Sequence, residues 1–171
     1  MKTLLIIGAG QHGILVKELA QDVFPDIRIE FVDDGNHIIK WKTSDLKELR
    51  KDYDAAIVSI GNNQVRKRMI DLLKELGYQI PTLVHPTAYV SPSAVINRGT
   101  IIGPNASVMS HAVVGDACII SAGAVIDHDA RIGNYVHVNV GSTVVARSIV
   151  NDEDKVLAGS IYGKDYEQSL Q

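Results

Sequence analysis

The chain has 171 residues, a formal charge of −3 at pH 7 and a single cysteine. This length suits one ordinary domain or two small ones with modest cores, so we expect self-association. The 17 Lys and Arg side chains are scattered and form no basic stripe, which argues against a nucleic-acid partner. The apolar run at residues 4–7 is too short for a signal peptide or a membrane span, so we expect a cytoplasmic protein without a membrane partner.

The first 80 residues alternate between short apolar runs and helix-like stretches. This βαβ pattern indicates a parallel sheet covered by helices. Strands are predicted at residues 3–7, 29–32 and 55–60, and helices at 13–23 and 65–76, where apolar residues recur at helical spacing. Three such strands make about one mononucleotide-binding half of a doubly wound fold, so residues 1–80 are expected to form a Rossmann-like α/β domain for a small ligand.

From residue 84 the sequence repeats with a period of six, and such repetition outranks local propensity in predicting a fold. Each sixth residue is aliphatic and β-branched, and the residue four places later is small or β-branched. This alternation predicts an all-β parallel β-helix with three flat faces per coil over residues 81–171. The aliphatic series is Val84, Val90, Ile96, Ile102, Val108, Val114, Ile120, Ile126, Ile132, Val138 and Val144, and the second series runs from Ala88 to Ser142.

Two further features of the β-helix are expected from this pattern. Cys118 falls on a small inward position, which favours a structural role over a reactive one. The rhythm is expected to break at residues 151–154, where the acidic stretch is interpreted as the polar cap that ends a solenoid. Residues 166–171 are expected to be a short polar closure or disordered.

A glycine-rich loop at residues 8–13 follows the first predicted strand and opens the first helix. Its N–H groups and the helix N-terminus suit a phosphate. Asp33 and Asp34 end the second strand, where a carboxylate can accept hydrogen bonds from a ribose or a base. An ordinary turn with a solvated acidic pair is the alternative. The same features would suit NAD, but the second half of a dinucleotide fold is absent.

Gly61, Asn62 and Asn63 follow the third predicted strand, where an open parallel sheet binds ligands beyond its strand ends. By physical chemistry alone, Asn62 is equally well explained as the N-cap of the next helix. No cluster of Cys, His and Asp has the spacing of metal ligands, so no metal is expected.

Five motifs in this order resemble the bacterial nucleotide-sugar acyltransferases, typified by UDP-4-amino-sugar N-acetyltransferases and including sialic-acid O-acetyltransferases. They are the glycine loop, Val32-Asp33-Asp34, Ile60-Gly61-Asn62-Asn63 leading into Arg66-Lys67-Arg68, the connector His85-Pro86-Thr87-Ala88, and the segment from Val125 through His128-Asp129 to His137. The resemblance covers residues 1 to about 150. It implies a left-handed β-helix, a homotrimer with active sites between neighbouring β-helices, acetyl-CoA as co-substrate and a nucleotide sugar, UDP-linked, as acceptor.

The resemblance also implies a role for each matching residue. His128 would be the general base that removes a proton from the acceptor amine, with Asp129 orienting its ring, and imidazole suits this task near neutral pH. His137, Gly141 and Ala146 would hold acetyl-CoA, with backbone N–H groups near Ala146 supporting the oxyanion. The nucleotide sugar would contact Gly10, His12, Gly13, Asp33, Asp34, Gly61, Asn62, Asn63 and Ser121.

Two departures from the family pattern keep alternatives open. Family members commonly carry Asn where this chain has Ser121, so N- and O-acetylation both remain possible acceptor chemistries. The β-helix is also expected to be about two coils shorter than in the family. The chain would then be either an acetyltransferase with a shortened groove or a nucleotide-sugar-binding protein with lost or weakened transfer activity. The retained His128-Asp129 pair favours the enzyme.

Overall fold

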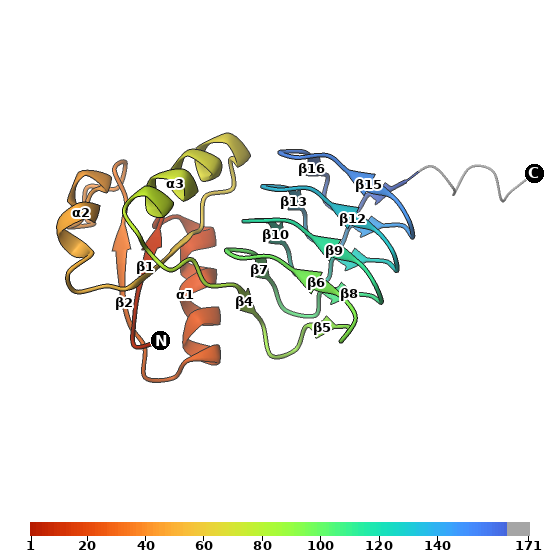
Figure 1. The fold of residues 1–171 in the computed structure, drawn as a ribbon, viewed down its shortest axis with the longest axis horizontal. Helices are drawn as coiled ribbons and strands as arrows, with labels where there is room; N and C mark the ends of the chain where they lie inside the picture. The colour runs from red at the N-terminus through yellow and green to blue at the C-terminus, as the bar shows by residue number, and fades with distance from the viewer. Residues whose placement is uncertain (164–171) are drawn as a thin grey trace, which may run out of the picture.

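A computed structural model describes residues 1–163 and places an α/β unit beside a β-helix (Figure 1). In the α/β unit, β1 (Thr3–Ile7), β2 (Arg28–Val32) and β3 (Ala55–Val58) form a parallel sheet in the order β2-β1-β3. Two long helices, α1 (Gln11–Val23) and α3 (Asn63–Glu75), accompany it. The sequence predicted these five elements within a few residues of their bounds. It missed a one-turn 3₁₀ helix, η1 (Thr43–Asp45), and the short α2 (Leu46–Leu49).

The sheet of the α/β unit has a helix layer on each face. Leu4 and Ile6 of β1 pack with α1, whereas Leu5 and Ile7 face the side that carries α2 and α3. All four of these side chains are buried, since parallel strands covered on both faces are apolar throughout. The expected Rossmann-like arrangement is therefore confirmed.

The remaining described residues form the β-helix. Its two-residue strands wind into three parallel sheets, which make the three sides of a prism. One sheet has the order β16-β13-β10-β7-β4, the second β17-β14-β11-β8-β5 and the third β15-β12-β9-β6. The strands are β4 (Leu83–Val84), β5 (Tyr89–Val90), β6 (Val95–Ile96), β7 (Ile101–Ile102), β8 (Ser107–Val108), β9 (Val113–Val114), β10 (Ile119–Ile120), β11 (Val125–Ile126), β12 (Arg131–Ile132), β13 (His137–Val138), β14 (Thr143–Val144), β15 (Ile149–Val150), β16 (Lys155–Val156) and β17 (Ile161–Tyr162).

The six-residue period arises because each strand and turn repeats the same backbone path. The second residue of each strand points into the prism, and from Ile102 to Val156 it is buried in one continuous core. The small residues of the second series, such as Ala124 and Ala130, are buried in the same core. From the turn after β6 onward, each turn carries one residue with positive φ, also every six places, namely Gly99, Asn105, His111, Ala117, Gly123, Asp129, Tyr135, Gly141, Arg147, Glu153 and Gly159. The predicted β-helix is thus confirmed.

The expected break after Val150 is wrong. Val156 and Tyr162 continue the six-residue series in β16 and β17, which pair with β13 and β14. Residues 151–154 form an ordinary turn between two strands, and Asp152 accepts a hydrogen bond from the backbone N–H of Asn134 one coil earlier, at 2.7 Å. Acidic residues fit there because turn side chains point outward. The prediction for residues 166–171 lies outside the described residues.

The α/β unit packs against one side of the prism, the sheet that contains β4, β7, β10 and β13 (Figure 1). The first residue of each strand points outward, and on this sheet Leu83, Ile101 and Ile119 are 0–3 % exposed. The corresponding Tyr89 and Ile149 on the other two sheets are 53 % and 63 % exposed. Hence only this side is covered by the α/β unit. None of the helices within residues 1–163 is long and apolar enough to cross a membrane.

Candidate active site

The glycine loop joins β1 to α1 and packs tightly on the end of β3. Gly8 has a φ of +105°, and a Cβ on Gly13 would lie 2.2 Å from the Gly8 carbonyl oxygen. Gly10, the N-cap of α1, has no side-chain capping bond, and a Cβ there would meet nothing within 4 Å. The loop therefore needs glycine at positions 8 and 13, and it leaves the first turn of α1 open for an anion.

The two aspartates after β2 organise loops of the α/β unit. Asp33 accepts hydrogen bonds from the backbone N–H groups of Ala9 (2.7 Å), Gly35 (2.8 Å) and Asn36 (3.0 Å), and the bond from Ala9 is the main cause of its lowered carboxyl pKa. Asp34 accepts from the N–H and hydroxyl of Thr43. Both carboxylates already have partners, so a direct contact to a ribose stays a prediction.

The three residues predicted to bind ligand after β3 have different environments. Gly61 and Asn62 are exposed, and the Asn62 side chain accepts from the N–H of Val65 at 3.0 Å. Asn62 is therefore the N-cap of α3, in line with the simpler interpretation. The Asn63 amide donates to the carbonyls of Glu153 (2.8 Å) and Asp154 (3.0 Å), so it joins α3 to the β-helix.

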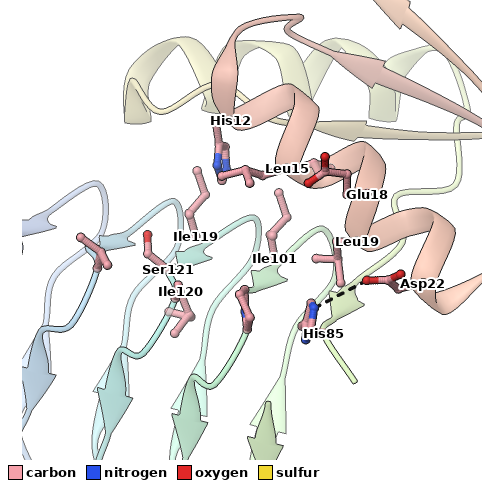
Figure 2. Close-up of a pocket in the computed structure, with 15 residues that line it drawn as sticks. His12, Leu15, Glu18, Leu19, Asp22, His85, Ile101, Ile119, Ile120 and Ser121 are labelled. Atoms are coloured by element: carbon pink, nitrogen blue, oxygen red, sulfur yellow. Dashed lines mark ion pairs between the residues drawn. The ribbon is translucent and has the colours of Figure 1, made fainter. Parts of the chain in front are cut away.

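A polar cluster forms where the start of α1 meets β10 and β13. The hydroxyl of Ser121 lies 3.1 Å from Nε2 of His137. The buried Nε2 of His12 and Nδ1 of His137 make no hydrogen bond of normal geometry within residues 1–163. Figure 2 shows His12 at the start of α1, above the β-helix face that carries Ile119 and Ser121. The cluster thus presents two imidazole nitrogens with unused hydrogen-bonding capacity.

Both histidines of this cluster are held neutral. Burial lowers the pKa of His137 to about 4, and the positive charges of Arg66 and Lys155 add to the effect. Burial, followed by Arg66, also lowers the pKa of His12. A neutral imidazole suits hydrogen bonding to a polar ligand group better than it suits pairing with a phosphate charge.

A cavity of about 350 Å³ opens beside this cluster, between α1 and the covered face of the β-helix (Figure 2). His12 and Ser121 lie at one end, and apolar side chains such as Leu19 and Ile101 line the middle. Asp22 lies 3.6 Å from His85 at the far end. The cavity therefore combines an apolar wall with a few polar groups, which is typical of a small-molecule site.

His128 and Asp129 lie in the turn between β11 and β12. Nδ1 of His128 is 2.8 Å from Oδ2 of Asp129, and both side chains are nearly half exposed. A carboxylate only accepts hydrogen bonds, so Nδ1 carries the proton and Nε2 keeps its lone pair. The hydrogen bond from His128 is the main cause of the lowered pKa of Asp129. The pair is an oriented imidazole with an available proton acceptor.

The turn on the next coil stacks on this pair. The N–H of Arg147 donates to the His128 carbonyl at 3.1 Å, which places neighbouring Ala146 directly beyond His128. Gly141, with a φ of +62°, lies in the turn after β13. The structure therefore groups Ala146 with His128 and Asp129, whereas Gly141 follows the strand that carries His137.

The polar cluster with His137 and the pair of His128 and Asp129 lie on different sides of the prism. His137 is on the sheet that packs against the α/β unit, and His128 is at the corner where the other two sheets meet. In a three-sided prism this corner is opposite that sheet. One chain therefore does not bring His128 to His12, Ser121 and His137. Among residues 1–163, no three His, Cys, Asp or Glu side chains gather as metal ligands would.

Both the α/β unit and the β-helix have counterparts in known proteins. Residues 3–73 match the family model described as the PglD N-terminal domain. The chain is 36 % identical over 112 residues to UDP-N-acetylbacillosamine N-acetyltransferase of Bacillus subtilis (strain 168), a match that covers 60 % of this chain. The acetyltransferase domain of PglB from Neisseria gonorrhoeae FA1090 superposes with a TM-score of 0.81 at 27 % identity, covering 96 % of this chain and 93 % of that one.

The chain is thus similar in sequence to a nucleotide-sugar N-acetyltransferase and in fold to a solved acetyltransferase domain. A perosamine N-acetyltransferase from Caulobacter crescentus, a histidine-to-asparagine mutant in complex with CoA and GDP-perosamine, shares the fold of this chain with a TM-score of 0.84. It is 23 % identical, and the match covers 96 % of this chain and 90 % of that one. The chain spans about half the length of the Bacillus protein.

The sequence marked Arg66 and Lys67 as part of a motif but gave them no role, and the structure shows what they contact. Arg66 is fully buried between α3 and the β-helix, and Lys67 pairs with Glu153 across the same contact. One signal was available: Arg66, Ile70 and Leu73 share the buried face of α3, where a charged residue is unusual. Cys118 is buried and burial raises its thiol pKa to about 12, in line with a structural role.

Proposed function

We propose that this protein transfers the acetyl group of acetyl-CoA to the amino group of a nucleotide-activated sugar, in the cytoplasm. The names of the relatives support this, since they are N-acetyltransferases and one is bound to CoA and GDP-perosamine. The observation that carries the proposal is His128, whose Nδ1 is tied to Asp129 and whose Nε2 remains available as a proton acceptor. The UDP sugar in the name of the Bacillus relative favours a UDP-linked acceptor.

The chemistry requires one proton acceptor and one site for developing negative charge. His128 takes a proton from the sugar amine as its nitrogen attacks the thioester carbonyl carbon. The carbonyl oxygen becomes an oxyanion, for which backbone N–H groups near Ala146 are the proposed donors. When the intermediate collapses, the carbon–sulfur bond breaks and the CoA thiolate takes the proton from the His128 imidazolium. The products are the amide and free CoA.

The nucleotide sugar is proposed to bind in the α/β unit and to reach the cluster of His12, Ser121 and His137. The open first turn of α1 suits its diphosphate. His137 and Gly141 would then lie beside the acetyl thioester. This arrangement needs His128 from a second copy, because the His128 corner of the same chain is on the opposite side of the prism. A homotrimer, in which each groove combines two copies, satisfies this requirement with one repeated contact.

Replacement of His128 tests the proposal. His128→Ala is expected to lower kcat for acetyl transfer by about 10²- to 10⁴-fold, the usual contribution of a general base. Affinity for the free nucleotide is expected to stay within about threefold, because nucleotide binding uses the α/β unit. The measurement is the release of free CoA from acetyl-CoA with UDP- and GDP-linked amino sugars.

His37→Ala is the control, since His37 is an exposed histidine that belongs to neither group of proposed site residues. It is expected to keep kcat within about threefold of wild type. A His128→Ala protein with near wild-type kcat would reject the base assignment. A wild-type protein that binds the nucleotide sugar without any transfer would instead support a binding protein.

A further inference from the structure

Arg66 is a buried cation for which the proposed chemistry has no use. It lies in the first turns of α3 and is 1 % exposed. No carboxylate within residues 1–163 lies at ion-pair distance from its guanidinium. Burial lowers its pKa to about 10, so it remains charged at neutral pH. A buried charge without an opposite charge is costly unless other polar groups compensate it.

Oxygen atoms from both parts of the molecule surround this guanidinium. On the side of the α/β unit, it donates to the carbonyl of Ile60 (2.8 Å) and to the side-chain oxygen of Asn63 (2.7 Å). On the side of the β-helix, it donates to the carbonyls of Ala117 (2.8 Å) and Tyr135 (2.6 Å). The rigid fork of donors in arginine is well suited to such a divided set of acceptors.

These acceptors border the two halves of the proposed site. Ile60 directly precedes the exposed turn at Gly61 and Asn62, on the nucleotide side. Tyr135 is two residues before His137, on the coil that carries the polar cluster. We propose that Arg66 is a positioning residue, which fixes the turn after β3 against the coil of His137 so that nucleotide and acetyl group meet in register. This inference rests on the proposed function.

The positive charge of Arg66 also affects the polar cluster of His12, Ser121 and His137. After burial, it is the next cause of the lowered pKa of His12 and of His137, and Lys155 adds to the effect at His137. The positive charges near the cluster therefore oppose protonation of both imidazoles. An arginine in this place thus holds the coil and adds to the lowering of the pKa of both imidazoles.

The test compares Arg66→Met, Arg66→Lys and the control Arg68→Met, since Arg68 is an exposed arginine in the same helix. Arg66→Met is expected to lower kcat at least tenfold, because small misplacements of reacting groups are costly, while the Kd for UDP stays within about threefold. Arg66→Lys is expected to be intermediate, since one ammonium cannot reach both sets of carbonyls. Arg68→Met is expected to match wild type.

A folded Arg66→Met protein with kcat within twofold of wild type would overturn the inference, as would losses of UDP affinity and kcat of equal size. If Arg66→Met does not fold, Arg66→Lys decides: a kcat at least threefold below that of Arg68→Met supports the inference, and a smaller difference overturns it.

Hydrogen exchange separates this inference from the proposed function if the wild type transfers no acetyl group. Amides at residues 61–63 and 135–137 are expected to exchange at least tenfold faster in Arg66→Lys than in Arg68→Met, because the bridge between the two parts is weakened. Equal exchange in these segments would overturn the positioning role, whatever reaction the protein performs.

Discussion

At the scale of single residues, histidines of one chain have contrasting environments. His128 is nearly half exposed and hydrogen bonded to the carboxylate of Asp129, which orients its ring. His137 is half-buried, and burial and the positive charges of Arg66 and Lys155 lower its pKa. The first environment suits a group that gains and loses a proton, and the second suits a neutral hydrogen-bonding group.

The neutral state of His137 makes a prediction about stability. Its pKa is about 4 in the folded protein, against 6.5 for an unperturbed side chain. As the pH falls from 7 to 4, the unfolded chain binds a proton at this position before the folded chain does. The free energy of unfolding should therefore fall over this range, by on the order of 2–3 kcal/mol from this residue.

Urea unfolding of wild type and His137→Gln at several pH values measures this contribution. The decrease in the free energy of unfolding between pH 7 and pH 4 is expected to be smaller in the variant, since glutamine does not titrate. Other titrating groups are common to both proteins and cancel in the comparison. An identical decrease in the two proteins would show that His137 titrates normally.

At the scale of elements, the glycine loop is fixed by one close backbone contact. A methyl group at Gly13 would meet the carbonyl of Gly8 at 2.2 Å, and neither backbone can move freely. Gly13→Ala is expected to lower the free energy of unfolding by about 1–3 kcal/mol, the usual cost of overpacking, and to weaken UDP binding. Gly10→Ala is the control for stability, because its methyl group would meet nothing within 4 Å.

Thermal unfolding with and without UDP measures both the loss of stability and the weaker UDP binding. A Gly13→Ala protein as stable as Gly10→Ala would mean that the turn relaxes at little cost. The stabilisation that UDP adds is expected to be smaller in Gly13→Ala than in wild type, because only ligand binding to the folded state raises stability.

The elements were largely predictable because each has a period of its own. Helical spacing located α1 and α3, and the six-residue series located every strand from β4 to β14. The acidic turn at residues 151–154 was misread because composition was given more weight than the period: Val156 and Tyr162 were already in register. The short η1 and α2 were missed, since one or two turns of helix leave little periodic signal.

The site was less predictable than the fold. Motifs indicated His12, Ser121, His128 and His137, and the structure brings the first, second and fourth together. Which side of the prism faces the α/β unit cannot be read from a repeat in which all three sides look alike. Arg66 and Asn63 make that contact through polar bonds to carbonyls, and such bonds carry no sequence period.

At the scale of the whole molecule, the pair of His128 and Asp129 lies on the opposite side of the prism from the cluster that contains His137. The proposed reaction therefore requires assembly of more than one copy. The two uncovered sheets expose apolar side chains near their ends, Tyr89 and Ile161 on one sheet and Val95 and Ile149 on the other, each more than half exposed. Apolar surface of this kind favours contact with another copy. A second copy that covers it can bring a His128 corner to the cleft beside His137, and the active site is then shared between chains.

Complementation between two inactive variants tests this account most directly. His128→Ala and His137→Ala chains, unfolded together and refolded in equal amounts, should form mixed trimers. A shared groove with an intact His128 and an intact His137 then arises with a probability of about one quarter, because each chain is drawn at random. We expect about a quarter of the wild-type rate of acetyl transfer. A rate no higher than the mean of the two separately refolded variants would contradict a site shared between copies.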